Sequence, residues 1–483
     1  MEHVLNCVRQ GYKYPWLRVL VVTGILITLV LAFLLPRLNV QADNTGWPST
    51  YLGDNGRSNF NSSESIINQS TASSLHLQWT QKKGTEAPIT SQPLVANGML
   101  YWSLWSGHVH AGLLNNGHFV WTQFVGLTNK SNCEPPKGGA ADTPTVATVS
   151  INGQNTSVLF IGGGNSQFYA LDAMTGKIIW HRALGNAYDA LWGSPAIYNG
   201  DVYIGVSPIG ACGAIQGQFF QLDATSGKLL NTFNVVPAGC IGGAVWGSPA
   251  IDEQTGMIYF GTGGPSTCSQ SEPYANSVVE LQASNLSYVA SWQILSNKVN
   301  ADFQSTPTLF SATINGVSTQ MIGILSDNGV YYALDRGNLA AGPLWQDQLA
   351  QPEKISYKFD NAAGTWDGTT LYVAANKTTL NGTSCPGSLS AINPADGSFQ
   401  WQDCLPDTPA LWAMGVPGLV VVGSGATFSV VNATDGTVLF SFTNTRPGAV
   451  FQGSASISGG VLYIGDNHGD LYAFAPSGSS HSK

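Results

Sequence analysis

The stretch FYALDAMTGKIIW, residues 168–180, recurs in weaker copies along the whole chain at intervals of 39 to 59 residues. Its first half alternates like a strand, MTGK has turn chemistry, and KIIW begins a second strand. Asp172 is placed to accept hydrogen bonds from turn amides, and Trp180 closes the hairpin with a large aromatic face. Each copy therefore predicts one β-hairpin.

Aligning the hairpin turns on Asp172 gives eight copies, and a second strand pair precedes each hairpin. The segments ALWGSPAIYNGDVYIGV (190–206) and AVWGSPAIDEQTGMIYFGT (244–262) are near duplicates of this preceding pair. A four-stranded unit of about 50 residues cannot bury both of its apolar faces alone, so radial stacking of the units is expected. The aligned positions are Leu113, Asp172, Asp223, Gln282, Asp335, Asn393, Asn432 and Ala475.

The repeats predict an all-β fold over residues 43–476, an eight-bladed β-propeller of four-stranded antiparallel blades. The eighth copy lacks its last strand. Residues 75–79 are expected to supply that strand, because Trp79 falls at the phase of the other hairpin tryptophans. Residues 477–483 are predicted to form a disordered tail.

Residues 1–42 predict one N-terminal hydrophobic helix before the propeller. Basic residues precede an uncharged apolar run at 19–35, which as a helix would be about 26 Å long, near the short limit for crossing a bilayer. The sequence VQA ending at Ala42 offers a cleavage site. A cleaved signal peptide and an uncleaved anchor with a cytoplasmic stub both remain open. Both place the propeller outside the cytoplasm, tethered to the membrane through 19–35 unless the chain is cleaved after Ala42.

Six of the seven cysteines lie in the part predicted to be exported, and no C-x-x-C pair occurs. An even number of this kind fits disulfides rather than metal ligands. We expect three disulfides: Cys385 with Cys404, Cys212 with Cys240, and Cys133 with Cys268. The first two pairs each bracket one copy of the hairpin, whose ends must meet, and the third pair follows by elimination.

Composition excludes some functions. Only 10% of the residues are charged and the net charge is -9, which argues against nucleic acid as a partner, since phosphates require basic patches. No G-x-S-x-G, H-E-x-x-H or P-loop motif occurs, which removes the common hydrolase, zinc protease and NTPase interpretations. A single closed ring is expected to be monomeric.

The pattern A-x-D-x-x-T-G-x-x-x-W at 170–180 resembles the tryptophan-docking repeat of the quinoprotein (PQQ-dependent) dehydrogenase superfamily of eight-bladed propellers. Residues 47–57, followed by 67–68 and 75–79, are similar to the N-terminal segment of that superfamily. CGAIQG at 212–217, together with AVWGSPAID, is similar to its polyvinyl-alcohol-dehydrogenase branch. Because some propellers of this repeat class are binding scaffolds, the resemblance implies the fold without deciding the activity.

The resemblance also implies a site. Members of the superfamily hold PQQ in a funnel at the ring axis, with a Ca²⁺ that polarises the quinone carbonyl and an Asp that takes the alcohol proton. Trp246 matches the tryptophan that stacks on the quinone, and Asp302 matches the general base. Trp192, the twin of Trp246, and Gln304 are further candidates to line the funnel, although either tryptophan could equally pack between inner strands.

Three matched positions depart from the superfamily pattern. The calcium-binding Glu falls on Cys212, the calcium-binding Asn falls on Gly264, and the Arg that contacts the quinone falls on Asp327. A hard cation needs about six to eight oxygen ligands, and a carboxylate at 327 would repel an anionic cofactor. These departures argue against PQQ and calcium, and the sequence identifies no metal ligand.

Two functions from different classes therefore stand. The first is an exported, membrane-tethered propeller that binds a small molecule or a protein at its axial funnel through a degenerate quinoprotein site. The alternative is a PQQ-dependent alcohol or polyol oxidoreductase with a rearranged metal site, which Trp246 and Asp302 favour. If these two residues do not converge on one funnel, the site implied by the resemblance fails.

Overall fold

The computed structural model describes Trp47, Cys133 and residues 49–82, 87–130, 135–185, 189–209, 215–264, 272–295, 301–352 and 363–478. The apolar run 19–35 lies outside these ranges, as do Cys212 and Cys268. Over the described ranges, no helix has the length and apolar character needed to cross a membrane.

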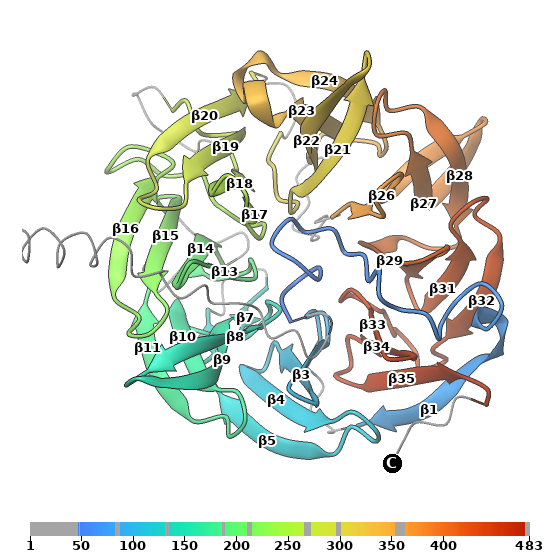
Figure 1. Ribbon diagram of the computed structural model, residues 1–483, viewed down its shortest axis with the longest axis horizontal. Helices are drawn as coiled ribbons and strands as arrows, with labels where there is room; N and C mark the ends of the chain where they lie inside the picture. The colour runs from blue at the N-terminus through green and yellow to red at the C-terminus, as the bar shows by residue number, and fades with distance from the viewer. Residues whose placement is uncertain are drawn as a thin grey trace, which may run out of the picture. The chain divides into compact units, whose positions relative to one another are not determined.

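Eight antiparallel sheets surround one axis, so the predicted propeller is confirmed (Figure 1). Blades one to four are β2 (Leu94–Ala96), β3 (Met99–Leu104), β4 (His108–Leu113) and β5 (Phe119–Phe124); β8 (Thr145–Ile151), β9 (Gln154–Gly162), β10 (Gln167–Asp172) and β11 (Ile178–Ala183); β13 (Ala196–Tyr198), β14 (Asp201–Pro208), β15 (Gln218–Asp223) and β16 (Leu229–Asn234); and β17 (Ala250–Asp252), β18 (Met257–Gly261), β19 (Ser277–Gln282) and β20 (Tyr288–Gln293). In the third blade the two-residue β12 (Asp189–Ala190) adds a fifth strand by pairing with the end of β14.

The second half of the chain repeats this layout. Blades five to eight are β21 (Thr308–Ile314), β22 (Val317–Leu325), β23 (Val330–Asp335) and β24 (Pro343–Gln348); β25 (Thr365–Trp366), β26 (Leu371–Leu380), β27 (Thr383–Ile392) and β28 (Phe399–Leu405); β29 (Pro409–Val416), β30 (Leu419–Ser424), β31 (Thr427–Asn432) and β32 (Val438–Thr443); and β33 (Ser456–Ser458), β34 (Val461–Gly465), β35 (Leu471–Pro476) and β1 (Leu75–Gln81). Outside the blades lie a short hairpin, β6 (Thr128–Asn129) and β7 (Lys137–Gly138), and two 3₁₀ helices, η1 (Ala72–Ser74) and η2 (Arg336–Ala341).

Tryptophans on outer strands dock against the hairpin turn of the following blade. Four blades make the same hydrogen bond at 2.9 to 3.0 Å: Trp121 Nε1 to Ala173 O, Trp180 Nε1 to Ala224 O, Trp345 Nε1 to Pro394 O, and Trp401 Nε1 to Ala433 O. The turn glycine lies under the indole ring: Gly176 has φ +70°, and a Cβ there would lie 2.6 Å from the Trp121 ring. The repeated Asp, Gly and Trp are therefore parts of one blade-to-blade joint.

The third blade has Asn231 in place of the docking tryptophan, and the turn that faces it differs as well. The fourth blade has Leu286 where other turns have glycine, and this residue keeps a left-handed φ of 54°. Leucine rarely adopts that conformation, because its Cβ crowds the backbone. Leu286 is buried in a core cluster with Phe219 of the third blade and Val279 of the fourth. It supplies apolar contact at an interface where the facing strand carries no aromatic side chain at the docking position.

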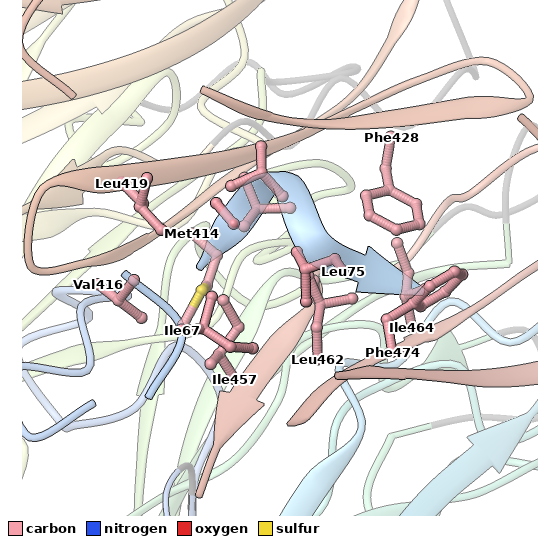
Figure 2. Packing of buried hydrophobic residues seen from close by; sticks show 14 of the residues in the cluster. Ile67, Leu75, Met414, Val416, Leu419, Phe428, Ile457, Leu462, Ile464 and Phe474 are labelled. Carbon is pink, nitrogen blue, oxygen red and sulfur yellow. The ribbon is translucent and has the colours of Figure 1, made fainter. Parts of the chain in front are cut away.

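Strand β1 closes the ring, as the sequence predicts. It pairs antiparallel with β35, and a Cβ on Gly117 of the first blade would lie 2.6 Å from the Trp79 ring. Leu75 and Ile67 pack among residues of the last two blades, including Met414 and Phe474 (Figure 2). The N- and C-terminal parts of the ring are thus joined by one continuous core.

Ser477, which the sequence assigns to the tail, donates its amide to Ser74 O at 3.2 Å, and 479–483 lie outside the described residues.

Cys385 and Cys404 form the predicted disulfide between β27 and β28, with their Cα atoms 5.4 Å apart. Cys133 and Cys240 are also disulfide-bonded, while both of their predicted partners fall outside the described ranges.

Residues 49–61, which we call the axial segment, run through the centre of the ring and contact all eight blades (Figure 1). Their hydrogen bonds measure 2.7 to 2.9 Å: Val146 N to Ser49 O, Leu52 N to Gln92 Oε1, Asn55 Nδ2 to Ile197 O, Ile251 N to Asn55 O, Leu309 N to Gly56 O, Trp366 N to Ser58 O, Gly415 N to Asn59 O, and Asn61 Nδ2 to Ile457 O. The inner strands are thereby held at fixed distances from the axis.

Arg57 anchors the axial segment from within. Its side chain is fully buried and donates to Pro249 O at 2.8 Å and to Tyr51 O at 2.7 Å. Burial lowers the pKa of Arg57 to about 10, an effect that the nearby charge of Asp54 partly offsets. The guanidinium therefore remains a cation at neutral pH, with backbone carbonyl oxygens as its hydrogen-bond acceptors.

The docking joint predicts a specific cost for a methyl group. Gly176→Ala should lower the free energy of unfolding by about 2–5 kcal/mol, because the left-handed backbone costs about 1–2 kcal/mol and the clash with Trp121 adds about 1–3 kcal/mol. Gly153→Ala is the matched control: its φ is +79°, and a Cβ there would have nothing within 4 Å. Urea unfolding of both variants measures the difference. Equal losses in the two variants would contradict the docking interpretation.

Candidate functional site

A belt of hydrogen bonds links the residues that precede the inner strands of the first five blades. Each link joins a backbone amide to a hydroxyl of the next blade: Gln92 N to Thr143 Oγ1 at 2.8 Å, Thr143 N to Ser194 Oγ at 2.9 Å, Ser194 N to Ser248 Oγ at 2.8 Å, and Ser248 N to Thr306 Oγ1 at 3.1 Å. The predicted site residues lie within a few positions of this belt, so the belt fixes the chain segments that carry them.

The structure brings Asp302 and the chain around Trp246 together. Gly263 donates its amide to Ala244 O at 2.8 Å, and Gly264 donates its amide to Asp302 Oδ1 at 2.7 Å. The Gly263–Gly264 pair therefore lies between the two segments. The indole of Trp246 is half-buried.

Asp302 is a partly exposed carboxylate with few protein contacts. Burial raises its pKa, and the hydrogen bond from the Gly264 amide opposes that rise. Its Oδ1 accepts the amide, while its Oδ2 has no hydrogen-bond partner among the described residues. A carboxylate in this state has one oxygen available to accept a proton.

Gln304 points to a neighbouring carboxylate. Its Nε2 donates to Asp327 Oδ2 at 2.6 Å, and the Asp327 amide donates to Asp302 O at 2.9 Å. Asp327, the position that departs from the superfamily Arg, thus lies next to the predicted base and accepts a hydrogen bond from Gln304. The carboxylate that the sequence expected to repel a cofactor is held by a hydrogen bond.

Trp192 is placed for packing. Its indole N–H donates to Pro208 O at 3.0 Å, and its ring lies 5.3 Å from that of Trp105 on the first blade. These contacts fit the second of the two interpretations given to this residue, a tryptophan that joins blades.

One residue near Gly264 was not identified from the sequence. Asn276 lies just before β19, and its amide donates to Gly263 O at 2.9 Å. Its Oδ1 is buried without a hydrogen-bond partner. No local motif marks this residue, because its position beside Gly264 depends on how the chain returns between β18 and β19.

These residues fit a quinone with a hard cation. A Cβ on Gly264 would lie 3.1 Å from Asp302 Oδ1 and 3.1 Å from Asn276 Oδ1, so two oxygens face the space that the glycine leaves. Oxygen donors are those that calcium prefers. No group of three or more His, Cys, Asp or Glu side chains gathers in the described ranges. Trp246 offers a flat face for the ring.

Asp142 is another carboxylate with a raised pKa, and unlike Asp302 it is buried. It is 2% exposed; its Oδ2 accepts the Gly162 amide at 2.9 Å, and its Oδ1 has no partner. Ser91 and Ser305 occupy the same position in other blades and bond to the second strand of their own blade in the same way. Asp142 therefore fastens β8 to β9.

Comparison with known proteins identifies the family. A model of the PQQ type, described as the β-propeller domain of glucose/ethanol/alcohol dehydrogenases, matches residues 47–346, more than half of the chain. The chain belongs to this family. The superfamily resemblance stated from the sequence is confirmed.

Two solved structures and one relative illustrate the range of this PQQ-type propeller. Polyvinylalcohol dehydrogenase of a Pseudomonas species is 23% identical over 438 residues, which cover 77% of this chain and 66% of the relative. The quinohemoprotein alcohol dehydrogenase of Comamonas testosteroni has a TM-score of 0.70 at 18% identity, with 92% of this chain and 82% of that one covered. BamB of Moraxella catarrhalis has a TM-score of 0.54 at 15% identity, with 83% and 99% covered.

At these identities the solved structures show the fold alone. The chain spans about two thirds of the length of the polyvinylalcohol dehydrogenase, 66% of its residues, so the activity of the whole relative does not transfer by similarity. The function of this chain is therefore inferred from the residues of the candidate site.

Asp142 gives a prediction on stability and pH. Burial raises its pKa well above the usual value, and no charged side chain contributes to the shift. The folded state therefore binds the proton more tightly than the unfolded state, so this carboxyl destabilises the fold increasingly as pH rises above about 4. We expect Asp142→Ser to stabilise the protein by about 1–3 kcal/mol at pH 8 and by less at pH 4.5.

Thermal unfolding of the wild-type and Asp142→Ser proteins at the two pH values tests this expectation. Asp172→Asn is the control, since other blades carry Asn393 and Asn432 at its position. A stability difference that is independent of pH would show that Asp142 is not the titrating group.

Proposed function

We propose that this protein is an extracytoplasmic, PQQ-dependent oxidoreductase of alcohols or polyols. The observation that carries the proposal is the Asp302 carboxylate, whose Oδ2 has no hydrogen-bond partner among the described residues. This carboxylate lies beside the chain of Trp246 in a propeller of the dehydrogenase family. The comparisons favour this second of the two sequence-based interpretations over a binding module with a degenerate site.

The chain's residues would divide the work as follows. Asp302 Oδ2 accepts the proton of the substrate hydroxyl, which makes the alkoxide carbon a better hydride donor. The half-buried Trp246 provides a planar surface that orients a ring at the axis. When bound, PQQ supplies the acceptor for the two electrons that leave the alcohol as it becomes a carbonyl compound.

Location outside the cytoplasm is supported by the cysteines. Cys385 is bonded to Cys404, and Cys133 and Cys240 are disulfide-bonded as well. Such bonds form and persist in oxidising compartments. Tethering through residues 19–35 remains part of the proposal, which protease protection of membrane-bound protein in intact cells would test.

A direct assay tests the proposed activity. The purified protein is mixed with PQQ and Ca²⁺, quinone binding is measured by equilibrium dialysis, and dye reduction is followed with a primary alcohol and with polyvinyl alcohol. We expect stoichiometric quinone binding and alcohol-dependent dye reduction. Absence of both would eliminate the oxidoreductase proposal and return the binding module as the better interpretation.

The role of Asp302 has its own test. Asp302→Asn should lower kcat by about 10²–10⁴-fold while quinone still binds, because the amide cannot accept the proton. Asp172→Asn, the same chemical change in a hairpin turn, should retain wild-type kcat. A variant Asp302→Asn with undiminished turnover would exclude Asp302 as the base.

A further inference from the structure

Asn276, beside the proton acceptor Asp302, combines two features that cost free energy. Its backbone has φ 48°, a left-handed conformation that costs a side-chain-bearing residue free energy, although asparagine tolerates it better than most. Its Oδ1 is buried and accepts no hydrogen bond from the described residues. An unsatisfied buried acceptor costs about 1–3 kcal/mol. Two unfavourable features at one residue indicate a group that satisfies the oxygen.

The surroundings indicate the chemistry of that group. The space left by Gly264 is bordered by Asn276 Oδ1 and Asp302 Oδ1, each 3.1 Å from the position of a Cβ. Asp302 makes no ion pair with a described residue. An amide oxygen and a carboxylate oxygen that face one small space form a donor pair for a hard cation such as Ca²⁺.

We propose that Asn276 supplies the carbonyl ligand of a hard cation site, in place of the side chain that Gly264 lacks. Asn276 Oδ1 and Asp302 Oδ1 would both be ligands of this cation, and Asp302 Oδ2 would remain the oxygen that accepts the substrate proton. The role of the cation in alcohol oxidation rests on the proposed function. Cation binding itself is measured without quinone or alcohol.

Backbone contacts hold Asn276 in position independently of a ligand. Its amide donates to Gly263 O at 2.9 Å, and its carbonyl accepts the Ile294 amide at 3.0 Å. The residue is thus fixed between the Gly263–Gly264 pair and the fourth blade, so the carbonyl is preorganised. Truncation of its side chain removes a ligand and leaves these backbone bonds in place.

The test measures Ca²⁺ affinity by calorimetry, and Tb³⁺ affinity by luminescence, on the full chain without PQQ. The wild-type protein should bind one Ca²⁺ at concentrations of about 10⁻³ M or below, the range of extracellular sites. Asn276→Gly, which keeps the left-handed backbone accessible, should weaken binding about tenfold or more. Asn276→Asp should strengthen it about tenfold, because ligand charge tunes calcium affinity.

Asn315 offers a matched control. It has φ 51° and lies in the exposed turn between β21 and β22. Asn315→Gly and Asn315→Asp make the same changes at an equivalent backbone conformation and should leave cation affinity unchanged. Gly264→Ala should weaken binding without removing an oxygen, since its methyl group enters the space between the two ligands.

The outcomes separate this inference from the proposed function. No Ca²⁺ or Tb³⁺ binding by the wild-type protein, or equal affinity in Asn276→Gly and wild type, would overturn the inference, even if dye-linked oxidation is observed. Cation binding that depends on Asn276, without quinone binding or dye reduction, would support the inference while the oxidoreductase proposal fails. If Asn276→Gly does not fold, the affinity change in the isosteric Asn276→Asp decides.

Discussion

The hydrogen bonds of the axial segment are the constraint on which the rest of the structure depends. Each propeller blade is held by its neighbours on both sides. These lateral contacts alone do not set the distance between the inner strand of the blade and the axis. Residues 49–61 bond to all eight blades and supply that distance. The belt from Gln92 to Thr306 then links the inner strands of five blades directly. A site built from side chains of several blades needs both constraints.

The lateral joints show how such a ring tolerates sequence change. An indole over a glycine is a complementary pair, in which the ring fills the volume that a Cβ would need. Between the third and fourth blades, Asn231 replaces the tryptophan and Leu286 replaces the glycine. An apolar contact is retained there because the turn, rather than the outer strand, provides the bulky side chain. Leu286 carries the backbone strain that glycine avoids elsewhere. What persists across the interfaces is their complementary volume, while the residues that provide it differ.

This difference explains what the sequence could and could not predict. The period of the hairpins predicted the fold, the closing strand and the disulfide between Cys385 and Cys404, because all three depend on spacing along the chain. The site residues were matched to the superfamily pattern one position at a time, so Gly264 was interpreted as the loss of a calcium ligand. Asn276 enters the same space from a different part of the chain, and only the fold shows that the two meet. A position-by-position comparison identifies missing side chains and overlooks their replacement in space.

Asp142 and Asp302 show why a raised pKa alone does not identify a functional group. Burial raises the pKa of both Asp142 and Asp302, and each accepts one glycine amide. Asp142 occupies a position where serine performs the same fastening in other blades, so its charge has no structural use. Asp302 is partly exposed, with one oxygen unoccupied by protein donors and Asn276 Oδ1 facing the same space. The arrangement of neighbouring oxygens, rather than the direction of the pKa shift, distinguishes a candidate catalytic carboxylate from a structural one.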